Sequence, residues 1–85
     1  MKYMYVWSVA PENLKAALKR FGEDSEPMDG LTQLGRWHSV GTDGGYRLIE
    51  TDDPVALKRM TLYWQDVMET KIVPVVDDEE TRKAI

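Results

Sequence analysis

Residues 34–51 read LGRWHSVGTDGGYRLIET, two β-type segments joined by a loop rich in glycine. The first segment lies in a strand predicted from about residue 31 to residue 40, and the second, residues 46–51, follows the loop Gly41–Gly45. Short loops that contain glycine connect the antiparallel strands of β-hairpins. We therefore predict a hairpin here, and the segments on either side of it decide the rest of the fold.

The N-terminal residues 2–9 are apolar on both faces of a predicted strand. A strand that is apolar on both faces is typical of the centre of a sheet, so we expect a central strand here. Because side chains alternate between the faces of a strand, one face carries Tyr3, Tyr5, Trp7 and Val9 and the other carries Met4, Val6 and Ser8.

Two amphipathic helices are predicted, one on each side of the hairpin in the sequence. The first begins at Pro11 and stops at Gly22, because proline is favourable at a helix start and glycine at a helix end. The second begins at Asp53-Pro54, where an N-cap acceptor precedes a proline at the first helical position. The inner faces are Leu14, Ala17, Leu18 and Phe21 in the first helix and Leu57, Met60, Thr61 and Trp64 in the second.

The remaining segments complete the order of elements. Residues 23–30 are polar and rich in turn formers, so we expect a surface loop there. The last strand is predicted at residues 71–76, and Pro74 assigns it to a sheet edge because proline donates no hydrogen bond to a neighbouring strand. The charged residues 77–85 are expected to form a frayed turn or a short helix.

The predicted order β-α-β-β-α-β is that of the ferredoxin-like α+β fold. In this fold two helices cover one face of a four-stranded antiparallel sheet. The other face would expose apolar side chains, and a large apolar patch usually marks an association surface. We expect a homodimer with the sheets of two subunits face to face.

Length and composition limit the possible partners. At 85 residues the chain has room for one domain, residues 1–85, with a small core. It has no cysteine, which fits a reducing cytoplasm. Its apolar segments are too short for a signal peptide or a membrane span. The net charge is −4 and the basic residues are scattered, so neither nucleic acid nor a membrane is an expected partner.

The only histidine of the chain lies on the first strand of the hairpin. His38 and Arg36 share a face of that strand, and Leu34 and Val40 are expected on the same face. They are the candidate catalytic residues, with His38 as acid or base and Arg36 as the anion-binding group. The expected ligand is a small aromatic or anionic organic molecule, and the candidate ligand-binding residues are Trp7, Trp37 and Tyr46.

Each of the main candidates also has a structural interpretation. In the structural interpretation, His38 is a packed, hydrogen-bonded side chain. In the same interpretation, Arg36 forms an ion pair with Glu50 across the hairpin. Trp37 is interpreted as core or interface packing in preference to a stacking platform. One histidine and no cysteine are too few ligands for a haem or transition-metal site, so we expect no metal and no cofactor.

Four segments, spread over nearly the whole chain, are similar to the sequences of a known protein family. They are YMYVWS at residues 3–8, LGRWH at 34–38, ETDDP at 50–54 and VPVVDDE at 73–79. In these the chain resembles the DUF3303-like family, small and mostly bacterial proteins of unknown function in the dimeric α/β-barrel superfamily. The resemblance implies a homodimer of ferredoxin-like subunits. It carries over no activity and no catalytic residue.

The superfamily that this resemblance implies includes cofactor-free monooxygenases, haem-degrading enzymes, small-ring isomerases and binding proteins. Its haem-binding members supply an axial histidine from a helix, and neither predicted helix here contains one. Two functions stay open. One is a pocket beside the hairpin with cofactor-free oxygenase- or isomerase-type chemistry, and the other is a non-catalytic module for dimerisation or protein interaction. A partly polar cavity that contains His38 would favour the first.

Overall fold

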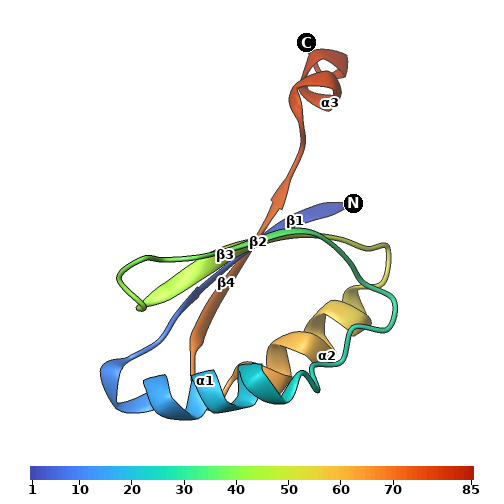
Figure 1. Cartoon of the computed structure of the whole chain (residues 1–85). Coiled ribbons are helices and arrows are strands. Elements are labelled where there is room, and N and C mark those ends of the chain that lie inside the picture. The colour runs from blue at the N-terminus through green and yellow to red at the C-terminus, as the bar shows by residue number, and fades with distance from the viewer.

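The computed structural model describes residues 1–85 and has the predicted order β-α-β-β-α-β, followed by a short C-terminal helix (Figure 1). The sheet is antiparallel with the strand order β2-β3-β1-β4, so the ferredoxin-like α+β fold is confirmed. The strands are β1 (Lys2–Ser8), β2 (Thr32–His38), β3 (Gly44–Glu50) and β4 (Glu69–Val75). The helices are α1 (Leu14–Glu23), α2 (Pro54–Trp64) and α3 (Asp78–Lys83), with a 3-10 turn η1 at Pro11–Asn13 before α1.

The position of β1 in the sheet agrees with its two apolar faces. It lies between β3 and β4, as predicted for a central strand. Pro74 lies on β4, which is an edge strand of the sheet, as predicted. Its partner on β1 is Tyr3. Tyr3, Tyr5 and Trp7 belong to the core under the helices, so the alternate side chains of β1 point to the uncovered side of the sheet.

Both long helices lie on the same face of the sheet (Figure 1). At the start of α2 the Asp53 carboxylate accepts hydrogen bonds from the backbone N–H groups of Val55 and Ala56, at 3.0 and 3.2 Å. The N-cap prediction is therefore confirmed. The side chains of α2 that are buried are Ala56, Leu57, Met60 and Trp64.

The end of α1 differs from the prediction. The helix continues through Gly22 to Glu23, and the residue that ends it is Asp24, in a left-handed conformation with φ of 50°. Aspartate tolerates this conformation better than most residues with a side chain, so glycine is not required at the helix end. Gly22 is accommodated inside α1, where open space surrounds the position of its missing β-carbon.

The inner face of α1 packs less closely than predicted. Only Ala17 of this helix is buried, whereas Leu18 and Phe21 are 57% and 44% exposed. Arg20 holds the helix to the end of α2 with hydrogen bonds to the carbonyl of Tyr63 at 2.7 Å and to the Asp66 carboxylate at 2.6 and 2.9 Å. Thus Arg20 anchors the C-terminal half of α1, and part of the apolar face of the helix stays uncovered.

The hairpin of β2 and β3 forms as predicted, but its register overturns two expectations. The pairing shifts between Gln33 and Gly35, which is the mark of a β-bulge at Leu34. Leu34 is therefore displaced from the regular alternation that was expected to place it beside Arg36. The register places Arg36 opposite Arg47 and Thr32 opposite Glu50, so the expected ion pair of Arg36 with Glu50 does not form.

The C-terminal residues form a short helix, α3, which is one of the two forms expected for them. Asp77 and Glu80 make a capping box at its start, with the Glu80 N–H donating to the Asp77 carboxylate at 2.8 Å. Lys2 forms ion pairs with Asp77 at 3.6 Å and with Glu80 at 3.4 Å. In Figure 1, α3 projects away from the rest of the chain at the end of β4. None of the helices has the length and apolar character needed to cross a membrane.

A matched pair of glycine substitutions tests the packing of the hairpin against β1. A β-carbon at Gly44 would collide with the backbone carbonyl of Trp7, so we expect Gly44→Ala to lower the free energy of unfolding by about 2 kcal/mol or more. Gly22→Ala should raise it by about 0.5–1 kcal/mol, because alanine is favoured inside a helix. Chemical denaturation measures both, and equal effects of the two substitutions would contradict this packing.

Candidate functional site

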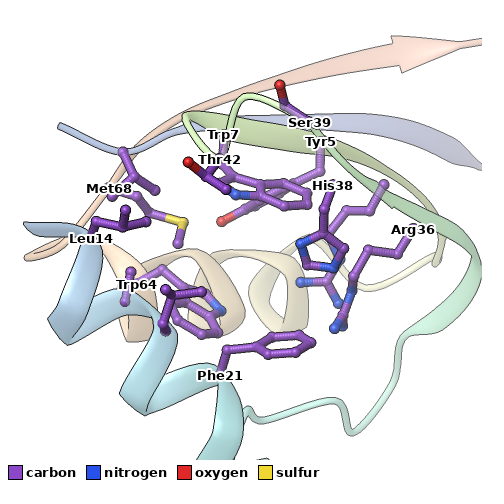
Figure 2. A pocket seen from close by; sticks show the side chains of 15 residues that line it. Tyr5, Trp7, Leu14, Phe21, Arg36, His38, Ser39, Thr42, Trp64 and Met68 are labelled. Atoms are coloured by element: carbon purple, nitrogen blue, oxygen red, sulfur yellow. The ribbon is translucent and has the colours of Figure 1, made fainter. Parts of the chain in front are cut away.

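A cavity of about 190 Å³ lies between α1 and the face of the sheet that the helices cover (Figure 2). We call it the α1 cavity. It is lined by fifteen residues, nine of them hydrophobic. The apolar lining comes from β1, from α1 and from the end of α2 and its following turn, namely Tyr5, Trp7, Val9, Leu14, Ala17, Leu18, Phe21, Trp64 and Met68. The polar lining comes mainly from the hairpin.

His38 is held at the α1 cavity by two aromatic side chains. Its ring meets Trp7 edge to face at a centroid distance of 5.5 Å, and it meets Phe21 in the same way at 5.2 Å. Figure 2 shows the imidazole extending from β2 toward Phe21. The His38 side chain is nevertheless exposed. This environment positions the ring without burying it, so it stays accessible to a ligand.

Arg36 approaches the same end of the α1 cavity from β2. Its guanidinium lies over the ring of Phe21, 5.3 Å from the centroid, and donates to the Glu26 carboxylate at 3.4 Å. Burial lowers the pKa of Arg36, and the nearby charge of Arg47 acts in the same direction. Arginine remains charged even so, because a guanidinium does not lose its proton in proteins. Arg36 is therefore a permanent positive charge beside the aromatic wall.

Glu26 organises the polar end of the α1 cavity. It lies in the loop after α1 and accepts two hydrogen bonds from Arg47, at 2.7 and 2.9 Å. The indole N–H of Trp64 also donates to this carboxylate. Burial alone would raise the pKa of Glu26, but the hydrogen bonds from Arg47 and Trp64 and the charges of both arginines outweigh it. The pKa of Glu26 is therefore below its ordinary value and the group is ionised.

Two residues that line the α1 cavity each contain a buried polar atom with no hydrogen-bond partner, the Tyr5 hydroxyl and Arg47 Nε. The residues are only 1% and 3% exposed, and both line the cavity. The Arg47 guanidinium lies 5.5 Å from the centroid of the Tyr5 ring. Burial raises the pKa of Tyr5 to about 12, so its hydroxyl keeps its proton. Since nearly all buried polar groups in proteins are satisfied, two such donors at one cavity need an explanation.

The structure brings together three of the five predicted site residues. Trp7, Arg36 and His38 all line the α1 cavity. Trp37 and Tyr46 are paired with each other on neighbouring strands, and they lie on the opposite face of the sheet from Arg36 and His38. They are 57% and 54% exposed, so Trp37 is not part of the core of this chain.

The apolar wall of the α1 cavity has a different source from the one predicted. Leu34 and Val40 do not line it, because Leu34 lies at the bulge and Val40 is fully exposed in the turn. The side chains of α1 form the wall instead.

Sequence reasoning also missed Tyr5, Glu26 and Arg47. Arg47 left a signal, because it alternates with apolar neighbours on a strand and a buried arginine needs an acid. Glu26, in a polar loop, left none.

Comparison with known families gives one match. The family model of a domain of unknown function, DUF3303, matches residues 1–85. No curated protein matches the sequence. The matched region includes every element that builds the α1 cavity. The description of the family assigns no ligand and no reaction, so the chemistry of the cavity must be argued from the residues of this chain. These include no group of three or more acidic or histidine side chains that could hold a metal ion.

The role of Glu26 can be tested by acid unfolding. Its pKa is lower in the folded chain than its ordinary value of 4.5, so the ionised carboxylate contributes stability that is complete above about pH 4.5. That contribution is lost as the pH falls through the folded pKa. We expect Glu26→Gln to lower the free energy of unfolding at pH 7 by about 3–5 kcal/mol, because it leaves Arg47 buried without its counter-charge.

Denaturant titrations between pH 7 and pH 3 measure both effects. The Glu26→Gln variant should lose less stability than the wild type as the pH falls below 4.5. Glu12→Gln removes an exposed carboxylate at the start of η1 and serves as the control. If the acid dependence of the Glu26→Gln variant equals that of the wild type, Glu26 does not hold Arg47 in the way described.

Proposed function

The chain belongs to the DUF3303 family, a domain of unknown function, and we propose that it binds a small organic molecule in the α1 cavity. The observation that carries this proposal is the uncovered apolar face of α1. Leu18 and Phe21 line the cavity and are about half exposed, and leaving apolar surface in water at a helix face that could be packed is unfavourable. A bound molecule would cover this surface.

The size of the α1 cavity limits the ligand. Its volume is about 190 Å³, and an apolar cavity of about 150 Å³ holds a benzene ring. One substituted six-membered ring therefore fits, and a larger ligand would extend out of the cavity. The mixture of an apolar wall with a few polar groups is typical of small-molecule sites.

The polar groups at the α1 cavity also allow a catalytic form of the proposal. His38 is accessible at the aromatic wall, which suits an acid or base that must reach a bound substrate. Arg36 would hold an anionic substrate or a developing oxyanion. A reaction of the cofactor-free oxygenase or isomerase type would use these two groups.

Because the chain has no cysteine, a reducing compartment such as the cytoplasm is the expected location.

The three tryptophans make the binding proposal testable by NMR. Trp7 and Trp64 line the α1 cavity, whereas Trp37 lies on the opposite face of the sheet and is an internal control. We expect single-ring fragments at millimolar concentration to shift the indole N–H signals of Trp7 and Trp64 and the ring signals of His38. The Trp37 signal should not move. A screen in which no fragment shifts the cavity signals would overturn the proposal.

A second candidate function is assembly through the uncovered face of the sheet, which we call the open face. The strand register and the alternation of side chains place seven apolar residues there. They are Met4, Val6, Trp37, Tyr46, Leu48, Val73 and Val75. Several are large and partly exposed, and a patch of this size supports an interface.

The charges of the open face favour a second copy of this chain as the partner. Two lysines and two glutamates flank the apolar centre, Lys2, Lys71, Glu50 and Glu69. A face with equal numbers of both signs is suited to pairing with itself across a two-fold axis. We therefore propose a homodimer with the two sheets face to face.

A charge at the centre of the open face should separate the dimer. We expect a dimer mass for the wild type in light scattering at micromolar concentration. Val6→Lys should weaken association by about 100-fold or more, because it places an unpaired charge in an apolar interface. Val55→Lys is the matched control, since Val55 is already 63% exposed on α2. A folded monomer for the wild type at this concentration would rule out the dimer.

A further inference from the structure

We propose that the Tyr5 hydroxyl and Arg47 Nε form an anion subsite at the inner end of the α1 cavity, and that the ligand is a small aromatic carboxylic acid in its ionised form. This inference rests on the proposed binding function of the cavity and names the class of its ligand.

The first argument is the pair of unpartnered donors. Arg47 Nε carries an N–H and no lone pair for accepting, so only an acceptor can satisfy it. The Tyr5 hydroxyl stays protonated and is also free to donate. In Figure 2 the ring of Tyr5 lies beside the indole of Trp7, in the layer between the sheet and the helices. Two buried donors beside one cavity are matched by a group with two acceptor oxygens.

The second argument is the charge around the cavity. None of the fifteen lining residues is acidic, whereas Arg36, Arg47 and His38 are basic. Glu26 is the one carboxylate bonded to the two arginines, at 2.7 Å from Arg47 and 3.4 Å from Arg36. The lining itself therefore carries two permanent positive charges and no negative one, whereas Glu26 and Asp24, whose charges act on Arg36, lie outside it. A monoanion among the lining residues is attracted by these positive charges, and a cationic ligand is repelled by them.

The Glu26 carboxylate also fixes which donor of Arg47 remains for a ligand. Both terminal nitrogens of the guanidinium are bonded to Glu26, at 2.7 and 2.9 Å. The guanidinium is therefore held in one orientation, and Nε is the nitrogen left over. A donor that is fixed before the ligand arrives loses little freedom on binding, which favours affinity.

The third argument is the aromatic surroundings of the remaining space. Trp7 and Phe21 present ring surfaces on either side of His38, and aromatic rings pack favourably against one another. The volume of about 190 Å³ admits one ring with a short substituent. An aromatic acid therefore satisfies the inner donors with its carboxylate and the outer wall with its ring.

Three probes that share one ring test the subsite, namely benzoate, benzamide and toluene. Binding is followed at pH 7 by the indole signals of Trp7 and Trp64. Benzoate should bind at least about tenfold tighter than benzamide, because hydrogen bonds to a charged group are stronger than those to a neutral one.

Tyr5→Phe removes one donor and keeps the ring. We expect this variant to lose about tenfold to hundredfold in benzoate affinity, with the affinity for toluene unchanged. Without ligand it should be at least as stable as the wild type, since the hydroxyl it loses has no partner. Tyr46→Phe makes the same change on the open face and should leave all three affinities as they are.

The outcomes separate this inference from the binding function itself. If toluene and benzamide bind as tightly as benzoate, the anion subsite is wrong and the small-molecule cavity stands. If Arg36→Met loses the preference for benzoate while Tyr5→Phe keeps it, the anion binds beside Arg36 and the assignment to Tyr5 and Arg47 is wrong. If none of the probes shifts the signals of Trp7 and Trp64, both proposals fail.

Discussion

A guanidinium buried in the middle of β3 is the constraint on which the rest of the structure depends. Arg47 is only 3% exposed, and a buried charge that lacks a counter-charge is strongly destabilising. Glu26 supplies the counter-charge from the loop after α1, and the same carboxylate accepts hydrogen bonds from Trp64 of α2 and Arg36 of β2. One carboxylate therefore connects the helical layer to two strands of the sheet.

This network explains why a cavity remains beside it. The carboxylate engages the terminal nitrogens of Arg47 and leaves Nε without a partner, while the guanidinium lies over the ring of Tyr5. On the other side, Arg20 holds α1 to the end of α2, so the helix spans the space without filling it. The contacts that stabilise the fold thus also define the chemistry of the α1 cavity, with fixed donors at one end and an apolar wall at the other.

The two faces of the sheet have different uses because the side chains of each strand alternate. Arg36 and His38 face the helices, whereas Trp37 between them faces away. The short stretch Arg36–His38 therefore contributes side chains to both surfaces of the sheet. The predicted pocket combined residues from both surfaces, because the sequence pattern indicates which residues share a face but not which face the helices cover.

Local patterns of the sequence by themselves determined the order of the elements, the edge position of Pro74, the cap at Asp53 and the shared face of Arg36 and His38. Each of these depends on residues close together in the chain. Only the tertiary structure decided the bulge at Leu34, the pairing of Arg36 with Glu26 in place of Glu50, and the meeting of Tyr5, Glu26 and Arg47. The physical reason is distance along the chain: Glu26 and Arg47 are separated by 21 positions, and a hairpin register and a loop path must both be set before their charges meet.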